Sequence, residues 1–123
     1  MTVIFYTSNR ETKKFQSLVI ENLLKSSGGF PIISVSQKPM KLGKNICVGD
    51  VGASNINTKR QILIGLKEAT THNVCMAEAD FLYPLEYFQF IPETDDTVYY
   101  LDNLYVIWSN RIDFIGSAIQ MVR

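Results

Sequence analysis

The hydrophobic positions at the start of the chain first form a continuous run and then recur at helical spacing. Residues 3–6 (VIFY) are uninterrupted and apolar, which is typical of a strand buried on both faces of a parallel sheet. Residues 11–25 place apolar side chains on one face of a helix and polar side chains between them. Ser8 or Asn9 is expected to cap this helix, and the glycines at 28–29 are expected to end it. The apolar residues that share its helical spacing are Phe15, Leu18, Val19 and Leu23.

The same alternation of strand and helix patterns continues through the middle of the chain. Residues 30–35 predict a second strand, and the polar stretch 36–45, which lacks periodicity, predicts a loop. Residues 46–48 predict a brief third strand, residues 56–70 a second helix, and residues 74–77 a fourth, buried strand. The residues expected on one face of the second helix are Ile62, Leu66 and Ala69.

The order strand, helix, strand, strand, helix, strand indicates an α/β fold. We expect a Rossmann-like, mostly parallel sheet flanked by helices, formed as one domain over residues 1–123. After Pro84 the chain becomes rich in aromatic residues, and residues 98–101 and 104–108 predict a hairpin around a turn at 102–103. If its aromatic side chains are exposed, this region would suit self-association into a homo-oligomer.

Composition and charge then narrow the classes of partner. Hydrophobic residues make up 46% of the 123 residues, enough for a packed core, and the 12 Lys and Arg balance the 12 Asp and Glu. Without a basic excess, nucleic acid is not an expected partner. Because no apolar run reaches the roughly 18 residues of a membrane helix and no signal peptide is apparent, we expect a cytoplasmic protein without an integral membrane segment. Cys47 and Cys75 lie in apolar runs and are expected to be buried, reduced thiols.

Two carboxylates, Glu78 and Asp80, follow the fourth predicted strand directly. In an open parallel sheet the carboxyl ends of the strands form one rim, so these residues should converge there with residues 7–9 and 36–37. Two like charges at such a rim repel each other unless they are protonated or neutralised, and Mg²⁺ or Mn²⁺ would neutralise them with oxygen ligands. In the alternative interpretation, Asp80 caps a turn before Pro84 and Glu78 faces solvent.

Three segments, in this order, resemble glycosyltransferases of the GT-A fold. Residues 3–12 (VIFYTSNRET) are similar to the first strand and nucleotide-binding loop of that family, and residues 33–39 (ISVSQKP) are similar to its second strand and loop. Residues 49–88 resemble its central part, where a helix, a buried strand and an acidic D-x-D-type motif lead into an aromatic-proline turn. The motif here is Glu-Ala-Asp, with glutamate in place of the usual first aspartate.

The resemblance implies a nucleoside-diphosphate sugar as donor and Mn²⁺ or Mg²⁺ as cofactor. Asp80 would coordinate the metal on the diphosphate, and Glu78 would assist in binding the metal or the ribose. The metal would offset the charge that develops on the departing nucleoside diphosphate. The remaining nucleotide-binding residues that the resemblance implies are Thr7, Ser8, Asn9, Ser36, Gln37 and Arg60. On residue types alone, these side chains also suit helix caps, plain loop positions and a solvated helix surface.

Two other functions compete with a sugar-nucleotide-dependent glycosyltransferase or its donor-binding core. A catalytically inactive module of the same fold would bind a nucleotide or a protein, and it is favoured because only residues 89–123 follow Phe88 and no motif there nominates a general base. A small nucleotidyltransferase ranks last, since residues 6–14 (YTSNRETKK) lack the glycine-rich loop that a triphosphate requires. The sequence does not specify the sugar, the base or the acceptor.

Overall fold

The computed structural model describes residues 1–102 of the chain. The chain divides into two compact units, Met1–Phe90 and Ile91–Arg123. All helices and strands of the described residues belong to the first unit, and residues 91–102 contain none, so residues 98–101 are not a strand. The second arm of the predicted hairpin, with Trp108, lies outside the described residues.

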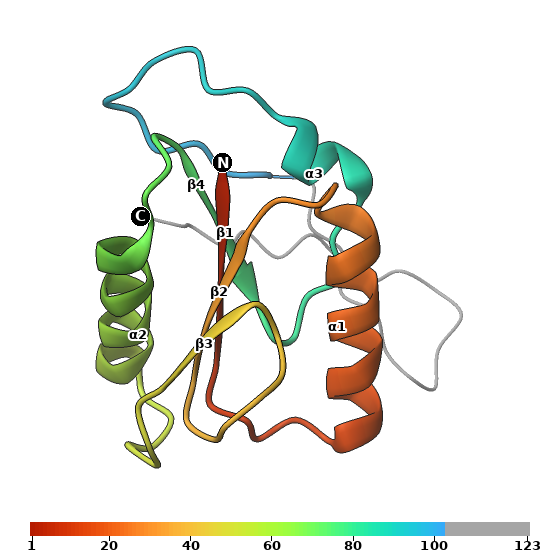
Figure 1. Cartoon of the computed structure of the whole chain (residues 1–123), viewed down its shortest axis with the longest axis vertical. Helices are drawn as coiled ribbons and strands as arrows, with labels where there is room; N and C mark the ends of the chain where they lie inside the picture. Colours follow the sequence, from red (N-terminus) through yellow and green to blue (C-terminus); the bar gives the residue numbers. More distant parts are fainter. Residues whose placement is uncertain (103–123) are drawn as a thin grey trace. The chain divides into compact units, whose positions relative to one another are not determined.

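The first unit is a three-layer α/β structure with a four-stranded, all-parallel sheet in the order β3-β2-β1-β4 (Figure 1). Helices α1 and α2 flank the sheet, as in a Rossmann-like fold, so the predicted fold class is confirmed (Figure 1). No helix among residues 1–102 is long and apolar enough to cross a membrane. The elements are β1 (Thr2–Thr7), α1 (Lys13–Ser26), β2 (Ile32–Ser36), β3 (Lys44–Cys47), α2 (Asn55–Glu68), β4 (Val74–Glu78) and the short α3 (Leu85–Gln89).

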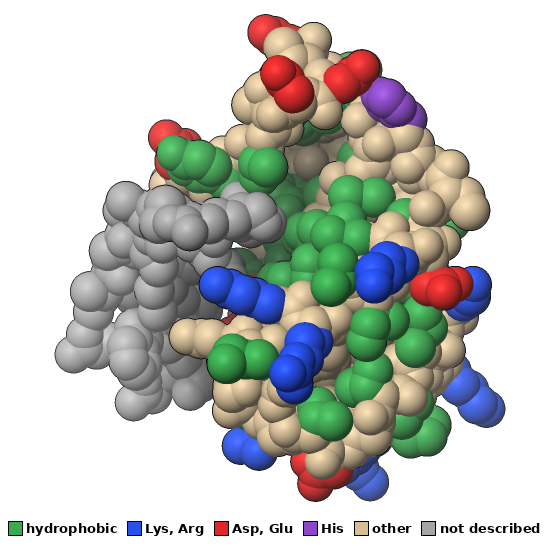
Figure 2. Space-filling view, turned by 90° about the vertical axis from the view of Figure 1, so that its left-hand side faces the viewer, with side chains coloured by type: hydrophobic (Ala, Val, Ile, Leu, Met, Phe, Trp, Pro, Cys, Tyr) green, Lys and Arg blue, Asp and Glu red, His purple; other side chains and the backbone are tan. Residues whose placement is uncertain are grey.

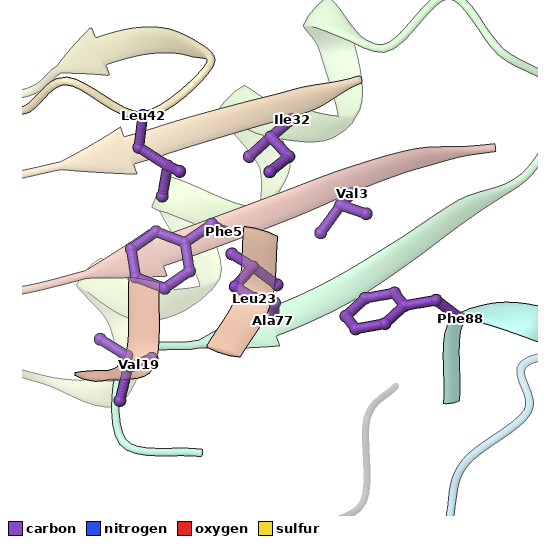
Figure 3. Close-up of a cluster of buried hydrophobic side chains, with 9 residues drawn as sticks. Val3, Phe5, Val19, Leu23, Ile32, Leu42, Ala77 and Phe88 are labelled. Atoms are coloured by element: carbon purple, nitrogen blue, oxygen red, sulfur yellow. The ribbon is translucent and has the colours of Figure 1, made fainter. Parts of the chain in front are cut away.

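The central strand β1 is buried along its whole length and supplies both faces of the sheet. Val3 and Phe5 point to the α1 side, where they pack with Val19 and Leu23 of α1 and with Phe88 of α3 (Figure 3). Removing one such side chain from water contributes about 1.5–3 kcal/mol, so this cluster anchors α1 and α3 to the sheet. The other members of the cluster are Ile32, Leu42, Ala77 and Ala79.

Helix α2 approaches the opposite face of the sheet more closely than its sequence pattern predicts. Its buried residues are Gln61 and Gly65, whereas Leu66, expected on the inner face, is 38% exposed. A Cβ atom added to Gly65 would overlap the side chain of Ile4, so only glycine permits this approach. The prediction that Leu66 lies on the inner face was therefore wrong. The helix backbone at Gly65 packs directly against Ile4 of β1, so a glycine occupies the contact where an aliphatic side chain was expected.

The beginning of α1 also differs from the sequence prediction. Thr12 caps the helix, with its Oγ1 accepting a hydrogen bond from the N–H of Phe15 at 3.3 Å, so neither Ser8 nor Asn9 is the cap. Leu18 is half-exposed and does not belong to the inner face.

The end of α1 follows the prediction. Gly28 and Gly29 adopt positive φ angles of 62° and 81° directly after the helix. This left-handed conformation is typical of residues that terminate helices, and glycine adopts it without the steric cost of a Cβ atom.

Strand β4 was expected to be buried, but it forms an edge of the sheet and only Ala77 within it is buried. Two tyrosines from the following segment satisfy its backbone: Tyr83 Oη accepts from the N–H of Glu78, and Tyr87 Oη donates to the carbonyl of Met76, both at 2.8 Å. Covering the polar groups of an edge in this way blocks pairing with another strand.

The two cysteines differ in their environments. The prediction that both thiols are buried was wrong for Cys47, which ends the edge strand β3 and is exposed. Cys75 is half-buried, and burial raises the pKa of its thiol to about 11. Both are free thiols.

Candidate functional site

The topology creates a switch point between β1 and β4. From β1 the chain crosses to β2 and β3 on one side, and it then returns through α2 to β4 on the other side. In open α/β sheets, ligands bind outside the carboxyl ends of the strands at such a point. Thr7 ends β1 and Glu78 ends β4, with Tyr6 and Glu78 as direct neighbours in the register.

A cavity of about 180 Å³ lies at this switch point. Its volume is below the roughly 300–1,000 Å³ of typical small-molecule sites, so its space suffices for one ring or group and not for a whole nucleotide. The residues that line it include the hydroxyl-bearing Thr7, Ser8 and Thr58 and the small residues Ala53 and Ala79. Polar side chains therefore surround the space where the strands end.

Three carboxylates, Glu11, Glu78 and Asp80, line the cavity, and no Lys or Arg is among the described residues that line it. Partial burial raises the pKa of Asp80 above its ordinary value, and the negative charges of Glu78 and Glu11 add to this effect. Tyr6 donates a hydrogen bond to Glu78 Oε1. Burial, together with this hydrogen bond, raises the pKa of Tyr6, which therefore stays protonated and holds Glu78 in place. The site carries excess negative charge.

Two buried carboxamides, Gln37 and Gln61, lie in the lining of the cavity. Gln37 is 4% exposed and its Nε2 donates to the carbonyl of Gly52 at 2.9 Å, whereas its Oε1 is buried without a partner among the described residues. Gln61 Nε2 donates to the carbonyls of Thr7 and Val35, both at 2.9 Å. Both amide nitrogens thus donate to backbone carbonyls, and the oxygen of Gln37 is left without a donor among the described residues. A buried acceptor without a donor costs about 1–3 kcal/mol, so a ligand that brings an N–H or O–H group is favoured.

The segment that carries Glu78 and Asp80, at the end of β4, is held in place by the aromatic-proline segment that follows it, residues 81–84. Asn22 of α1 binds the backbone of Tyr83 twice, accepting from its N–H at 2.7 Å and donating to its carbonyl at 3.1 Å. Ser26 donates to the same carbonyl at 2.8 Å, and the Tyr83 hydroxyl in turn accepts from the N–H of Glu78. This chain of contacts fixes the end of β4 relative to α1.

Five of the predicted site residues meet at this cavity: Thr7, Ser8, Gln37, Glu78 and Asp80. Glu78 and Asp80 therefore line the same cavity as Thr7, which ends β1, and Ser8, which follows it.

The other three predicted residues do not line the cavity. Asn9 has a positive φ of 55°, and its Oδ1 accepts hydrogen bonds at 2.8 Å from the backbone N–H groups of Gln37 and Lys38. The Ser36 hydroxyl donates to the carbonyl of Lys38 at 2.7 Å. Arg60 is exposed on α2. Asn9 and Ser36 therefore shape the loop that carries Gln37.

Sequence reasoning missed the four other polar residues of the cavity lining: Tyr6, Glu11, Thr58 and Gln61. For Gln61 a signal existed, because it lies four residues before Gly65 and therefore on the same helical face. A glycine on a helix face allows the helix to sit close to the sheet, where a neighbouring glutamine reaches backbone carbonyls. No comparable signal marked Glu11.

The donor set of this site suits a hard divalent cation. Glu78 and Asp80 supply carboxylate oxygens, but within residues 1–102 no group of three or more Asp, Glu, His or Cys side chains is placed to hold a metal ion. A cation held by one or two carboxylates fills its remaining positions with water and ligand phosphates, which is the usual arrangement for Mg²⁺. The residues therefore fit a metal that binds together with a phosphorylated ligand.

Comparison with known proteins identifies no relative. No protein-family model, no curated protein and no solved structure matches the chain.

Proposed function

We propose that the chain is the donor-binding core of a glycosyltransferase and that its cavity takes part of a nucleoside-diphosphate sugar together with Mn²⁺ or Mg²⁺. One observation carries the proposal. The acidic pair and Gln37, whose buried Oε1 has no partner among the described residues, belong to the lining of one cavity at the switch point of a parallel sheet. The resemblance of three sequence segments to GT-A glycosyltransferases supports the same assignment.

Charge gives the reason for the metal. All charged side chains among the described residues of the lining are negative, so a diphosphate brought to Glu11, Glu78 and Asp80 is repelled unless a cation lies between them. Asp80 and Glu78 would hold that cation, and Tyr6 would keep Glu78 oriented through its hydrogen bond. When bound, the metal would offset charge on the departing nucleoside diphosphate.

Hydrogen bonding gives the reason for the nucleoside. Gln37 Oε1 needs a donor, and a nucleobase N–H or a ribose hydroxyl supplies one. The cavity volume of about 180 Å³ suits one such ring, with the diphosphate and sugar outside it. The phosphates would then lie toward Asp80, which is exposed to solvent.

A second candidate function is a catalytically inactive module that binds a nucleotide or a protein. The small cavity favours it, because a site of this volume does not by itself enclose both a donor and an acceptor. The two functions share the binding site and differ in turnover.

Thermal unfolding of the full chain with UDP, GDP, CDP or ADP, each with and without Mn²⁺, tests the binding site. We expect stabilisation by one nucleotide only when Mn²⁺ is present, of about 2.7 kcal/mol at a hundredfold excess over Kd. Asp80→Asn should abolish this stabilisation, whereas the same substitution at Asp50, which is exposed and does not line the cavity, should preserve it. No stabilisation by any nucleotide would refute the proposal.

Turnover separates the two functions. Release of nucleoside diphosphate from the matching sugar nucleotide supports a glycosyltransferase. Binding that requires Mn²⁺ but gives no release, even with candidate sugar acceptors present, supports the inactive module.

A further inference from the structure

Helix α2 has an unusual distribution of side chains. Its inner face carries Gln61 and Gly65, while Ile56, Leu63 and Leu66 are 64%, 50% and 38% exposed. These three aliphatic residues follow one another at intervals of seven and three, which places them along the side of the helix that faces away from the sheet. Exposed aliphatic residues aligned on one side of a helix are typical of an interaction surface, since a helix gains nothing by presenting them to water.

Three cations are interleaved with this stripe: Lys59, Arg60 and Lys67. All three are exposed, and none forms an ion pair within residues 1–102. The only acidic residue of α2, Glu68, is paired with Lys44 at 2.6 Å. Figure 2 views the molecule from the side on which α2 lies in Figure 1 and shows Lys and Arg side chains set among hydrophobic ones.

We propose that this outer face of α2, formed by Ile56, Lys59, Arg60, Leu63, Leu66 and Lys67, docks on an anionic lipid surface. The helix would lie in the plane of the membrane interface, with its aliphatic side chains among the upper acyl segments and its cations beside the phosphate groups. We choose an anionic lipid surface because of charge complementarity. The face carries three cations and no unpaired carboxylate, so it matches a surface of anionic headgroups.

The composition of the face favours lipid over a protein partner. The centres of protein interfaces are enriched in Trp, Tyr and Phe and depleted in Lys. This face has no aromatic residue and two lysines, Lys59 and Lys67. Arg60, for which the resemblance suggested a contact with the donor, belongs to this outer face and is absent from the cavity lining.

Helix α1 provides a contrast within the same fold. It also exposes two leucines, Leu18 and Leu24, at 50% and 57%. They are six residues apart, which turns them about 120° from each other around the helix, so they form no stripe. An ion pair of Glu21 and Lys25 lies on the same helix. Substitutions on α1 therefore serve as matched controls.

Co-sedimentation of the full chain with vesicles tests the proposal. We expect binding to vesicles of equal parts phosphatidylcholine and phosphatidylglycerol, weaker binding at high salt, and little binding to pure phosphatidylcholine. Each lysine near an anionic surface contributes roughly fivefold in affinity, so the double substitution Lys59→Gln and Lys67→Gln should weaken binding about 25-fold. The matched pair Lys13→Gln and Lys14→Gln on α1 should leave binding unchanged, as should Leu24→Ser, whereas Leu63→Ser should weaken it.

Several results would overturn the proposal. These are absence of binding to the anionic vesicles, equal losses from the α1 and α2 substitutions, or binding that is indifferent to salt. A dimer in sedimentation velocity that Leu63→Ser dissociates would assign the face to a second copy of the chain instead. Circular dichroism and thermal unfolding of each variant check that the fold is retained. Nucleotide binding plays no part in these measurements, so the outcome is independent of the proposed function.

Discussion

Adding one methyl group at Gly65 is expected to destabilise the protein even though alanine is the better helix former. The added Cβ would overlap Cγ2 of Ile4 and lie 3.5 Å from both Cβ and Cγ1 of the same side chain. Ile4 is completely buried in the central strand, and its β-branched side chain is stiff at χ1. Neither partner can move aside without displacing α2 from the sheet.

The magnitude follows from two opposing terms. Replacing glycine by alanine inside a helix stabilises it by about 1 kcal/mol, whereas overpacking a well-packed core costs about 1–3 kcal/mol. Gly65→Ala should therefore lower the free energy of unfolding by up to about 2 kcal/mol. Ile4→Leu removes the Cγ2 methyl at an expected cost below about 1.5 kcal/mol. In that background Gly65→Ala should become neutral or stabilising, because the overlapping atom is gone.

Urea unfolding of the wild-type chain, the two single variants and the double variant measures this coupling as a double-mutant cycle. We expect a coupling free energy of about 1–2 kcal/mol in favour of the double variant. Two results would refute this explanation: Gly65→Ala has the same effect in both backgrounds, or it stabilises the wild-type chain by the full helix-propensity term. In either case the close contact between α2 and β1 does not fix the position of the helix. A displaced α2 would also withdraw Gln61 from the carbonyl of Thr7, so nucleotide stabilisation should fall in the single Gly65→Ala variant.

Two further predictions concern titratable groups. Because the folded state raises the pKa of Asp80, its contribution to stability is fully present below the unfolded pKa of about 3.9 and is lost as pH rises through the folded value. Asp80→Asn should therefore stabilise the ligand-free protein at neutral pH, by less than about 1 kcal/mol because the side chain is exposed to solvent. This gain in stability should vanish in acid. A variant that is less stable than the wild type at neutral pH contradicts the prediction. Cys75, with a pKa of about 11, should react far more slowly at pH 8 than the exposed Cys47, as mass spectrometry after iodoacetamide treatment would show; equal labelling of both thiols in the folded protein contradicts the burial of Cys75.

The sequence predicted the elements well where burial is symmetric. Residues 3–6 read as a strand buried on both faces, and β1 is the central strand of the sheet. It was less informative for β4, because an apolar run is compatible with both a central and an edge strand. Within residues 1–102, only the hydrogen bonds show that tyrosine hydroxyls, and no further strand, lie along one side of β4.

The candidate site divides in the same way. The acidic pair could be found from the sequence, because Glu78 and Asp80 follow a strand pattern directly. The role of Asn9 could not be found from the sequence. Its side-chain oxygen accepts hydrogen bonds from the N–H groups of Gln37 and Lys38, which lie about 28 residues further along the chain. The unpaired oxygen of Gln37 could not be predicted from the sequence either, because it depends on the tertiary hydrogen bond that its Nε2 donates to the carbonyl of Gly52.

By itself, then, the sequence determined which segments up to residue 78 become strands and helices and which carboxylates stand at a strand end, because hydrophobic period and local residue order decide those features; it did not reveal α3 and wrongly predicted a strand at residues 98–101. The tertiary structure alone decided the strand order, the burial of Gln61 and Gly65 on the inner face of α2, and the grouping of Glu11, Gln37 and Asp80 around one cavity. The reason is physical: strand order and helix seating depend on contacts between residues far apart in the chain, such as that of Gly65 with Ile4, and no local pattern encodes the distance at which two such surfaces meet.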